Sequence, residues 1–140
     1  MHLAADAYEV DAEILADEEI VSNFLDHCPE SIGMTKMIEP QVYTYRGRRA
    51  SDWGVSGFVL IAESHVSVHT FPNRGYINVD IFSCKNFDQN AAEKYIRESF
   101  GAKKLRTWLM SRGIDYDHPR TLYGAMARDR VGIMERNRNE

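Results

Sequence analysis

The sequence predicts an α+β fold: a two-layer α/β sandwich in which two helices pack on one face of a mostly antiparallel sheet. Three observations predict it. The chain has 140 residues, of which 44% are hydrophobic, enough for a single core. Residues 55–84 hold three apolar runs separated by short turns, which favours antiparallel pairing. Two amphipathic helical patterns, at residues 11–28 and 88–101, flank these runs and would cover one face.

The N-terminal part is predicted to form a strand and then a helix. Residues 1–10 show a mixed alternation of polar and apolar side chains, as a first strand would. Residues 11–28 carry apolar residues at helical spacing, and their acidic residues come early, where the helix dipole favours them. Pro29 stands just past the expected end of this helix. Cys28 is then most simply a small core residue.

The next segment begins with an interrupted strand. Residues 34–45 read as extended, and Pro40 restricts them to an edge strand or a broken one. A polar loop with two glycines follows at residues 46–54. Residues 55–62 are almost continuously apolar, which predicts a strand covered on both faces.

Two alternating strands come next. They span residues 65–71 and 76–84, and Pro72, Asn73 and Gly75 supply the turn between them. The apolar positions that share a face within each strand are Val66, Val68 and Thr70 in the first and Ile77, Val79 and Ile81 in the second.

The C-terminal third is predicted to start with the second helix. In residues 88–101, Asp88 is a plausible N-cap and Gly101 a C-terminal stop. Residues 103–113 read as a further strand. Residues 117–140 are weakly amphipathic, which leaves two alternatives open: a helix or a mobile tail.

Composition and charge exclude several classes of protein. The net charge is −4 and the basic residues are scattered, so we expect no nucleic-acid partner. No apolar run approaches the roughly 20 residues that cross a bilayer, and the N-terminus lacks the pattern of a secretory signal. We therefore expect a cytoplasmic protein that does not bind membranes.

The cysteines and histidines do not suggest a metal site. Cys28 and Cys84 belong to no clustered motif, and two thiols in a cytoplasmic chain are expected to be free. His65 and His69 are four residues apart, a spacing that brings side chains together on a helix. Because this segment reads as strand and no third ligand is evident, we predict no metal.

A polar group is predicted at one end of the central hairpin. If residues 55–62 pair with 66–71 and turn near 63–64, Ser56 lies roughly opposite Phe71, with His69 as its diagonal neighbour. Two serines and a histidine could then converge from regular strands.

Ser64 would sit at the bend itself, and Cys84 ends the next strand and could reach the same edge. Taken singly, each residue has an ordinary explanation: a turn-forming serine, a hydrogen-bonded structural histidine, a small apolar cysteine. Together they suggest a Ser–His or Cys–His nucleophile, but spacing alone identifies no carboxylate to orient the imidazole.

The segments GVSGFVLIAESHVSVHTFP and YINVDIFSC resemble the core of a known family. The family is that of the prokaryotic S-adenosylmethionine decarboxylases, small pyruvoyl-dependent enzymes of spermidine and polyamine biosynthesis. Its pattern is G-V-S-G, an apolar strand, E-S-H, H-T-W-P-E and then D-x-F-x-C. About thirty residues match at the family's own spacing, which is far more specific than a lone short motif.

The resemblance implies that the chain is a zymogen that cleaves itself between Glu63 and Ser64. The products would be a beta chain of residues 1–63 and an alpha chain of 64–140 that begins with a pyruvoyl group made from Ser64. By the same resemblance, His69 promotes processing by proton transfer and Ser56 assists it. A planar peptide bond is inert, so the bend must hold the carbonyl strained and close to the hydroxyl.

The resemblance also implies how turnover proceeds. The pyruvoyl cofactor would form a Schiff base with the substrate amine and withdraw the electrons that departing CO₂ leaves behind. Cys84 matches the family's proton donor, and a thiol that is protonated at neutral pH suits an acid. The family's small size and open sheet further imply a homodimer acting on a small molecule.

The substrate-binding positions depart from the family pattern. Phe71 keeps the aromatic that stacks on adenine in relatives, but Asn73 replaces the glutamate that looks like their ribose ligand. The second stacking aromatic is missing, and Trp53 is the candidate to replace it. Three alternatives follow: S-adenosylmethionine as substrate, which the resemblance favours; arginine or ornithine, which some members of the superfamily decarboxylate; or a non-catalytic binding module.

Overall fold

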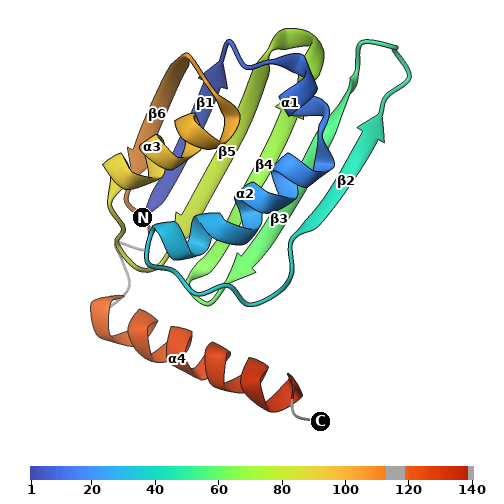
Figure 1. The fold of residues 1–140 in the computed structure, drawn as a ribbon. Helices are drawn as coiled ribbons and strands as arrows, with labels where there is room; N and C mark the ends of the chain where they lie inside the picture. Colours follow the sequence, from blue (N-terminus) through green and yellow to red (C-terminus); the bar gives the residue numbers. More distant parts are fainter. Residues whose placement is uncertain (113–118, 139–140) are drawn as a thin grey trace.

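An antiparallel sheet forms the body of the protein (Figure 1). The computed structural model describes residues 1–112 and 119–138. Within these residues the strands are β1 (His2–Tyr8), β2 (Gln41–Arg46), β3 (Trp53–Ile61), β4 (Ser64–Phe71), β5 (Tyr76–Ser83) and β6 (Lys104–Met110). They lie in the order β2-β3-β4-β5-β1-β6, so the first strand is inserted between the fifth and the sixth.

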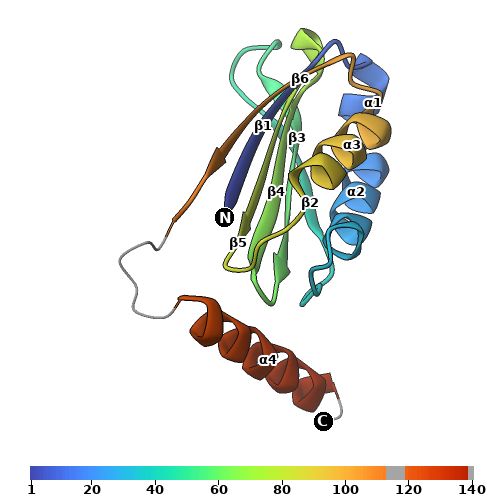
Figure 2. The same cartoon turned by 90° about the vertical axis from the view of Figure 1, so that its left-hand side faces the viewer.

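Three helices lie along one face of this sheet, as Figure 2 shows: α1 (Ala12–Ala16), α2 (Glu18–Ser31) and α3 (Gln89–Phe100). A short 3₁₀ turn, η1 (Pro72–Arg74), joins β4 to β5. The core lies between the helices and the sheet and is built mainly from Leu, Ile, Val and Phe side chains. The predicted two-layer α+β sandwich is confirmed.

The predicted helix over residues 11–28 is wrong in its bounds. Asp17 interrupts it, because its backbone is extended and its carboxylate accepts from the N–H groups of Glu19 and Ile20 at 2.8 and 3.3 Å. Pro29 does not end the helix but lies within its last turn, where the missing N–H removes only one hydrogen bond before the helix stops. Cys28 is fully buried in α2, as expected, and burial raises its pKa to about 12.

Other predicted boundaries are confirmed. The edge strand β2 begins directly after Pro40. Asp88 caps α3 by accepting from Asn90 and Ala91, and Gly101 ends it with a φ of +62°, a conformation that glycine adopts without strain. The strand predicted over 103–113 exists but is shorter: β6 spans Lys104–Met110, residues 111 and 112 are not part of it, and 113 lies outside the described residues.

The hairpin of β3 and β4 is tighter than the sequence suggested. Ser56 pairs directly with His69, and Ile61 pairs with Ser64. Only Ala62 and Glu63 remain for the turn, which is therefore centred one residue earlier than expected. This shift moves the partner of Ser56 by two residues, so the predicted diagonal placement of His69 is replaced by a direct one.

The prediction that residues 55–62 are covered on both faces is wrong for the single chain. Val55, Val59 and Ile61 face the helices and are buried. Phe58 and Leu60 point the other way and are 40% and 42% exposed. Because the three helices lie on one side, the apolar character of β3 leaves an open sheet face.

Thr70 ties the sheet to the helical layer. Its hydroxyl donates to the carbonyl of Leu15 at 2.7 Å and accepts from the N–H of Val55 at 2.9 Å, and the residue is fully buried. Gly54 lies against the Thr70 carbonyl so closely that a Cβ there would collide with backbone. The first glycine of the GVSG segment is thus required by close approach of two strands.

The C-terminal segment forms α4 (Pro119–Arg138), so the helical alternative is confirmed for these residues; 117, 118, 139 and 140 lie outside the described ones. Both views show α4 beyond the end of the sheet at which β3 turns into β4 (Figures 1 and 2). Among the described residues, no helix is both long and apolar enough to cross a membrane.

Candidate active site

The turn between β3 and β4 holds the backbone in an unusual conformation. Ser64 has a φ of +155°, and among the described residues only one other non-glycine residue, Glu9, has a positive φ. Backbone held in such a sparsely populated region costs on the order of 1–3 kcal/mol and persists only where its surroundings enforce it. The unusual conformation is that of the Ser64 backbone, directly after Glu63.

Hydrogen bonds hold Glu63 on both sides. The residue is only 6% exposed, and its carboxylate accepts from the N–H of Thr35 at 3.1 Å. Its backbone carbonyl accepts from the N–H of Cys84 at 2.9 Å. The carbonyl carbon beside Ser64 therefore belongs to a fixed and polarised group, because an N–H on the oxygen favours negative charge there.

His65 lies beside the hydroxyl of Ser64, with 3.2 Å between Nδ1 and Oγ. Burial, followed by the neighbouring His2, lowers the pKa of His65, so its imidazole is neutral at neutral pH. The ring packs edge-on against Phe82, which limits its rotation. A neutral imidazole in this position can orient the hydroxyl or receive its proton.

Cys84 directly follows the residue that pairs with Ser64, since Ser64 lies opposite Ser83 in the β4–β5 register. The structure thus brings the predicted thiol to the predicted cleavage site. Burial is the largest influence on this thiol and raises its pKa, with Glu63 adding to the effect; Arg130 of α4 opposes it. The group is therefore a protonated thiol at neutral pH.

Ser56 and His69 form a second polar group. The Ser56 Oγ lies 2.9 Å from Nδ1 of His69, and the pair is on the exposed sheet surface. However, His69 lies five residues beyond Ser64 on β4. The rise per residue of a strand puts the two about 16 Å apart. Ser56 and His69 thus lie together as expected, but Ser64 of the same chain does not lie with them.

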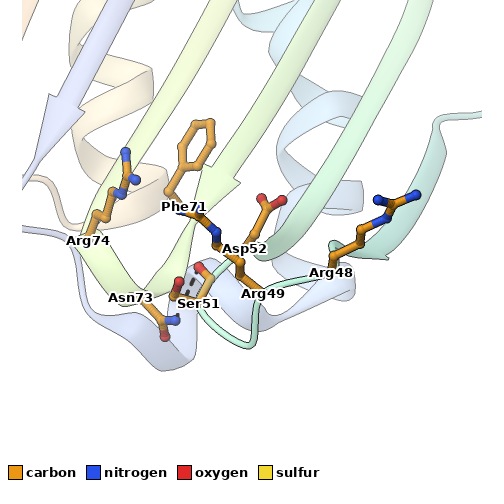
Figure 3. A pocket seen from close by; sticks show the side chains of 7 residues that line it. All are labelled: Arg48, Arg49, Ser51, Asp52, Phe71, Asn73 and Arg74. Carbon is orange, nitrogen blue, oxygen red and sulfur yellow. Dashed lines mark hydrogen bonds between the residues drawn. The ribbon is translucent and has the colours of Figure 1, made fainter.

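A cavity of about 440 Å³ lies at the far end of β4 (Figure 3). Phe71 and Asn73 line it, as the sequence led us to expect of a binding site, and the side-chain amide of Asn73 donates to the carbonyl of Ser51 at 3.4 Å. The remaining lining residues are Arg48, Arg49, Ser51, Asp52 and Arg74. Trp53 instead lies beneath the guanidinium of Arg46, 5.3 Å from the ring centroid, so its predicted role as second aromatic has no support here.

Several site residues were not singled out from the sequence. His65 could have been found, because it directly follows Ser64 in the Glu-Ser-His run. No spacing rule identifies the other three, because each lies far in sequence from its neighbour in the site: Thr35 from Glu63, Asp52 from Phe71 and Arg130 from Ala62. His65 and His69 are four positions apart on β4, which puts them about 13 Å from each other. The described residues include no group of three metal-ligating side chains.

The fold and this site define a class of protein: a two-layer α/β domain with a Glu-Ser turn, a positive φ at the serine and a protonated thiol beside it. The family model described as S-adenosylmethionine decarboxylase matches residues 1–113. The chain therefore belongs to the S-adenosylmethionine decarboxylase family. Members of this family are decarboxylases, that is, carboxy-lyases.

Individual relatives agree with this assignment. A protein of Archaeoglobus fulgidus named S-adenosylmethionine decarboxylase proenzyme is 36% identical over 113 residues, 80% of this chain and 96% of that protein. One of the same name from Thermotoga maritima is 31% identical over 135 residues, 96% of this chain and 89% of the relative. The crystal structure of the adenosylmethionine decarboxylase from Aquifex aeolicus matches with a TM-score of 0.68 and 30% identity, covering 84% and 92% of the two chains.

Proposed function

We propose that this chain is a self-processing, pyruvoyl-dependent decarboxylase that converts S-adenosylmethionine to decarboxylated S-adenosylmethionine and CO₂ in the cytoplasm. The observation that carries the proposal is the geometry of one peptide bond. Ser64 has a positive φ, and the Glu63 carbonyl next to it accepts a hydrogen bond from Cys84 at 2.9 Å. The relatives named proenzymes support the same reading.

Self-processing would use the chain's own groups in three steps. The Ser64 Oγ attacks the Glu63 carbonyl carbon and its proton passes to the departing Ser64 nitrogen, so the amide becomes an ester. Removal of the Ser64 Cα proton then breaks the Cβ–Oγ bond and releases the Glu63 carboxylate. Water finally displaces the nitrogen as ammonia, and a pyruvoyl group is left at the start of the 64–140 chain.

The residues around the turn suit the first step. The backbone N–H of Cys84 points at the oxygen on which negative charge develops during the attack, as an oxyanion-hole donor does. The neutral His65 lies within 3.2 Å of the hydroxyl that must lose its proton. The anchored Glu63 side chain keeps the turn from relaxing, which preserves the near-attack geometry.

In turnover, the pyruvoyl carbonyl supplies a sink for the electrons that carboxyl loss leaves on the substrate. The chain's own contribution is to return a proton to that carbon. Cys84 stands next to the Ser64 position and its raised pKa keeps the proton on the thiol at neutral pH. Cys84 therefore has both the position and the protonation state of a general acid.

The remaining predicted residues fit a homodimer. Phe71 is seven residues from Ser64 on β4, about 23 Å away, too far for both to contact one small substrate within a chain. An isologous dimer with the strands of its two sheets opposed would bring the Ser64 end of one copy to the His69 and Phe71 end of the other. Phe58 and Leu60, exposed on the open face, are the side chains such packing would bury.

The cavity favours an adenosine-containing substrate over arginine or ornithine. Phe71 offers an aromatic plane for the adenine. Asn73 stands where relatives have a glutamate, but Asp52 still supplies a carboxylate to the same cavity. The three arginines would repel the side chain of arginine or ornithine.

Intact mass and substrate assays test the proposal. Purified protein should show no 16.1 kDa chain but two fragments, ending at Glu63 and beginning at the pyruvoyl derived from Ser64. Ser64→Ala should remain whole, whereas Ser22→Ala, in α2, should cleave normally. Carboxyl-labelled S-adenosylmethionine should release CO₂ faster than labelled arginine or ornithine. A chain that stays whole after prolonged incubation would instead indicate a non-catalytic binding module.

A further inference from the structure

Arg130 connects the C-terminal helix to the cleavage turn. The family match ends at residue 113, so α4 lies beyond it. One residue of α4 nevertheless reaches the site: the Nη1 of Arg130 donates to the carbonyl of Ala62 at 3.0 Å, across 68 residues of sequence. Ala62 is one of the two residues of the turn and precedes Glu63, whose carbonyl carbon is the point of attack.

The charges around this contact are of opposite sign. Arg130 brings a guanidinium that is always charged. Glu63 brings a buried carboxylate, held on its far side by the N–H of Thr35. The positive charge of Arg130 also acts on the thiol of Cys84, whose pKa it lowers against the larger effect of burial. Arg130 thus bonds the turn directly and acts on the neighbouring thiol, as the N-terminal ammonium of Met1 also does.

This contact gains importance when the chain is cut. The elimination step forms a second carboxylate at Glu63, the new C-terminus of the 1–63 chain. Two negative charges on one buried residue repel each other, and a fixed cation close by offsets that cost. A guanidinium that already holds the preceding carbonyl needs little rearrangement to do so.

We propose that Arg130 of α4 is a positioning residue for self-processing, which fixes the cleavage turn through Ala62 and stabilises the carboxylate that leaves Glu63 in the elimination step. The inference rests on the proposed self-processing. In that step water takes the Ser64 Cα proton, the electrons of the Cα–H bond form a Cα=Cβ double bond, and the Cβ–Oγ bond breaks with its electron pair left on the Glu63 carboxylate, which Arg130 then faces.

A time course of freshly synthesised full-length protein tests this role. Wild type, Arg130→Ala, Arg130→Lys and Arg128→Ala are sampled for intact mass with and without hydroxylamine, which cuts the ester but not the amide. Arg130→Ala should complete cleavage at least about tenfold more slowly and accumulate material that hydroxylamine cuts. Arg130→Lys, which keeps the charge without the planar fork, should fall between the two.

Arg128→Ala is the matched control, because it removes the same charge from an exposed position two residues away on α4. It should behave as wild type. The melting temperature of uncleaved Arg130→Ala in a Ser64→Ala background should equal that of Ser64→Ala alone, which separates positioning from general destabilisation. If Arg130→Ala cleaves as fast as wild type and accumulates no ester that hydroxylamine cuts, the role of Arg130 is refuted while the proposed function stands. If wild type never cleaves, the proposed function fails first.

Discussion

Cys84 should make the decarboxylation rate depend on pH only at the alkaline side. Burial and Glu63 raise the pKa of its thiol above the ordinary 9.0, and a proton donor works only below its pKa. We therefore expect a rate that is flat through neutral pH and falls as the pH rises past the ordinary thiol range. Cleavage would add a second carboxylate at Glu63, which raises the pKa of the thiol further. The rate should then decline at a higher pH. Steady-state CO₂ release across a pH series measures it.

Replacement of the thiol separates its two contributions. Cys84→Ala keeps the backbone N–H, so we expect normal cleavage but a decarboxylation rate lower by about a hundredfold. Cys84→Ser should be similarly slow and should lose the alkaline fall, because a serine hydroxyl does not titrate in this range. Unchanged turnover in Cys84→Ala would remove the residue from the role of acid.

At the level of single residues, counting along strands placed Cys84 next to Ser64, as the structure has it. It placed the bend one residue too late and the partner of Ser56 two residues too far along β4. Arg130 could not be predicted in this way, because its contact with Ala62 depends on where a whole helix comes to rest. Asp52 likewise enters the cavity of Phe71 only through the path of a loop.

Thr70 shows how the elements hold each other. Thr70→Val preserves shape but leaves the Leu15 carbonyl and the Val55 N–H without their buried partner. We expect a loss of about 2–4 kcal/mol in the free energy of unfolding, since each such group costs about 1–3 kcal/mol. Urea denaturation in a Ser64→Ala background, where the chain stays whole, gives the value. Thr44→Val, which removes only an exposed hydrogen bond from the Thr44 hydroxyl to the Glu18 carboxylate, should change it by less than about 1 kcal/mol.

The strands were easier to predict than the helix boundaries or the covered faces. Alternation located β4 and β5 because one face of each is buried and the other is not. The break at Asp17 went unpredicted because the apolar stripe continues through it, and only the side-chain cap on Glu19 and Ile20 reveals it. The run in β3 suggested two covered faces because its sequence carries residues suited to a partner as well as to the core.

The proposed dimer makes a prediction about mixtures of two inactive chains. Ser64→Ala cannot be cut, and His69→Ala should be cut poorly in a dimer of its own. When the two are produced together, the intact His69 of the Ser64→Ala chain should complete the site at Ser64 of the other. We expect the His69→Ala chain to be cleaved in the mixture, as intact mass would show. Co-production of His69→Ala with Ser56→Ala serves as the negative control and should leave both chains whole, because Ser56 and His69 form one pair and neither chain then supplies it intact.

Co-produced chains that remain as whole as each alone would rule out sharing of the site between copies. The distance of about 16 Å between Ser64 and His69 would then require another base, and His65 is the group within reach. Pattern alone could not have raised this question, because it depends on how far apart strand positions lie in space.

The position of β1 between β5 and β6 has a consequence for the severed protein. The proposed cut would leave β1, β2 and β3 on one peptide and β4, β5 and β6 on the other, so that their strands interleave and three strand pairs join them. Neither peptide could dissociate while the sheet remains folded. Once melted, however, the two must find each other by diffusion, so renaturation becomes second order and slows with dilution. The proposed processing would therefore replace the refolding of one chain by the reassembly of two, which is slower when the protein is dilute.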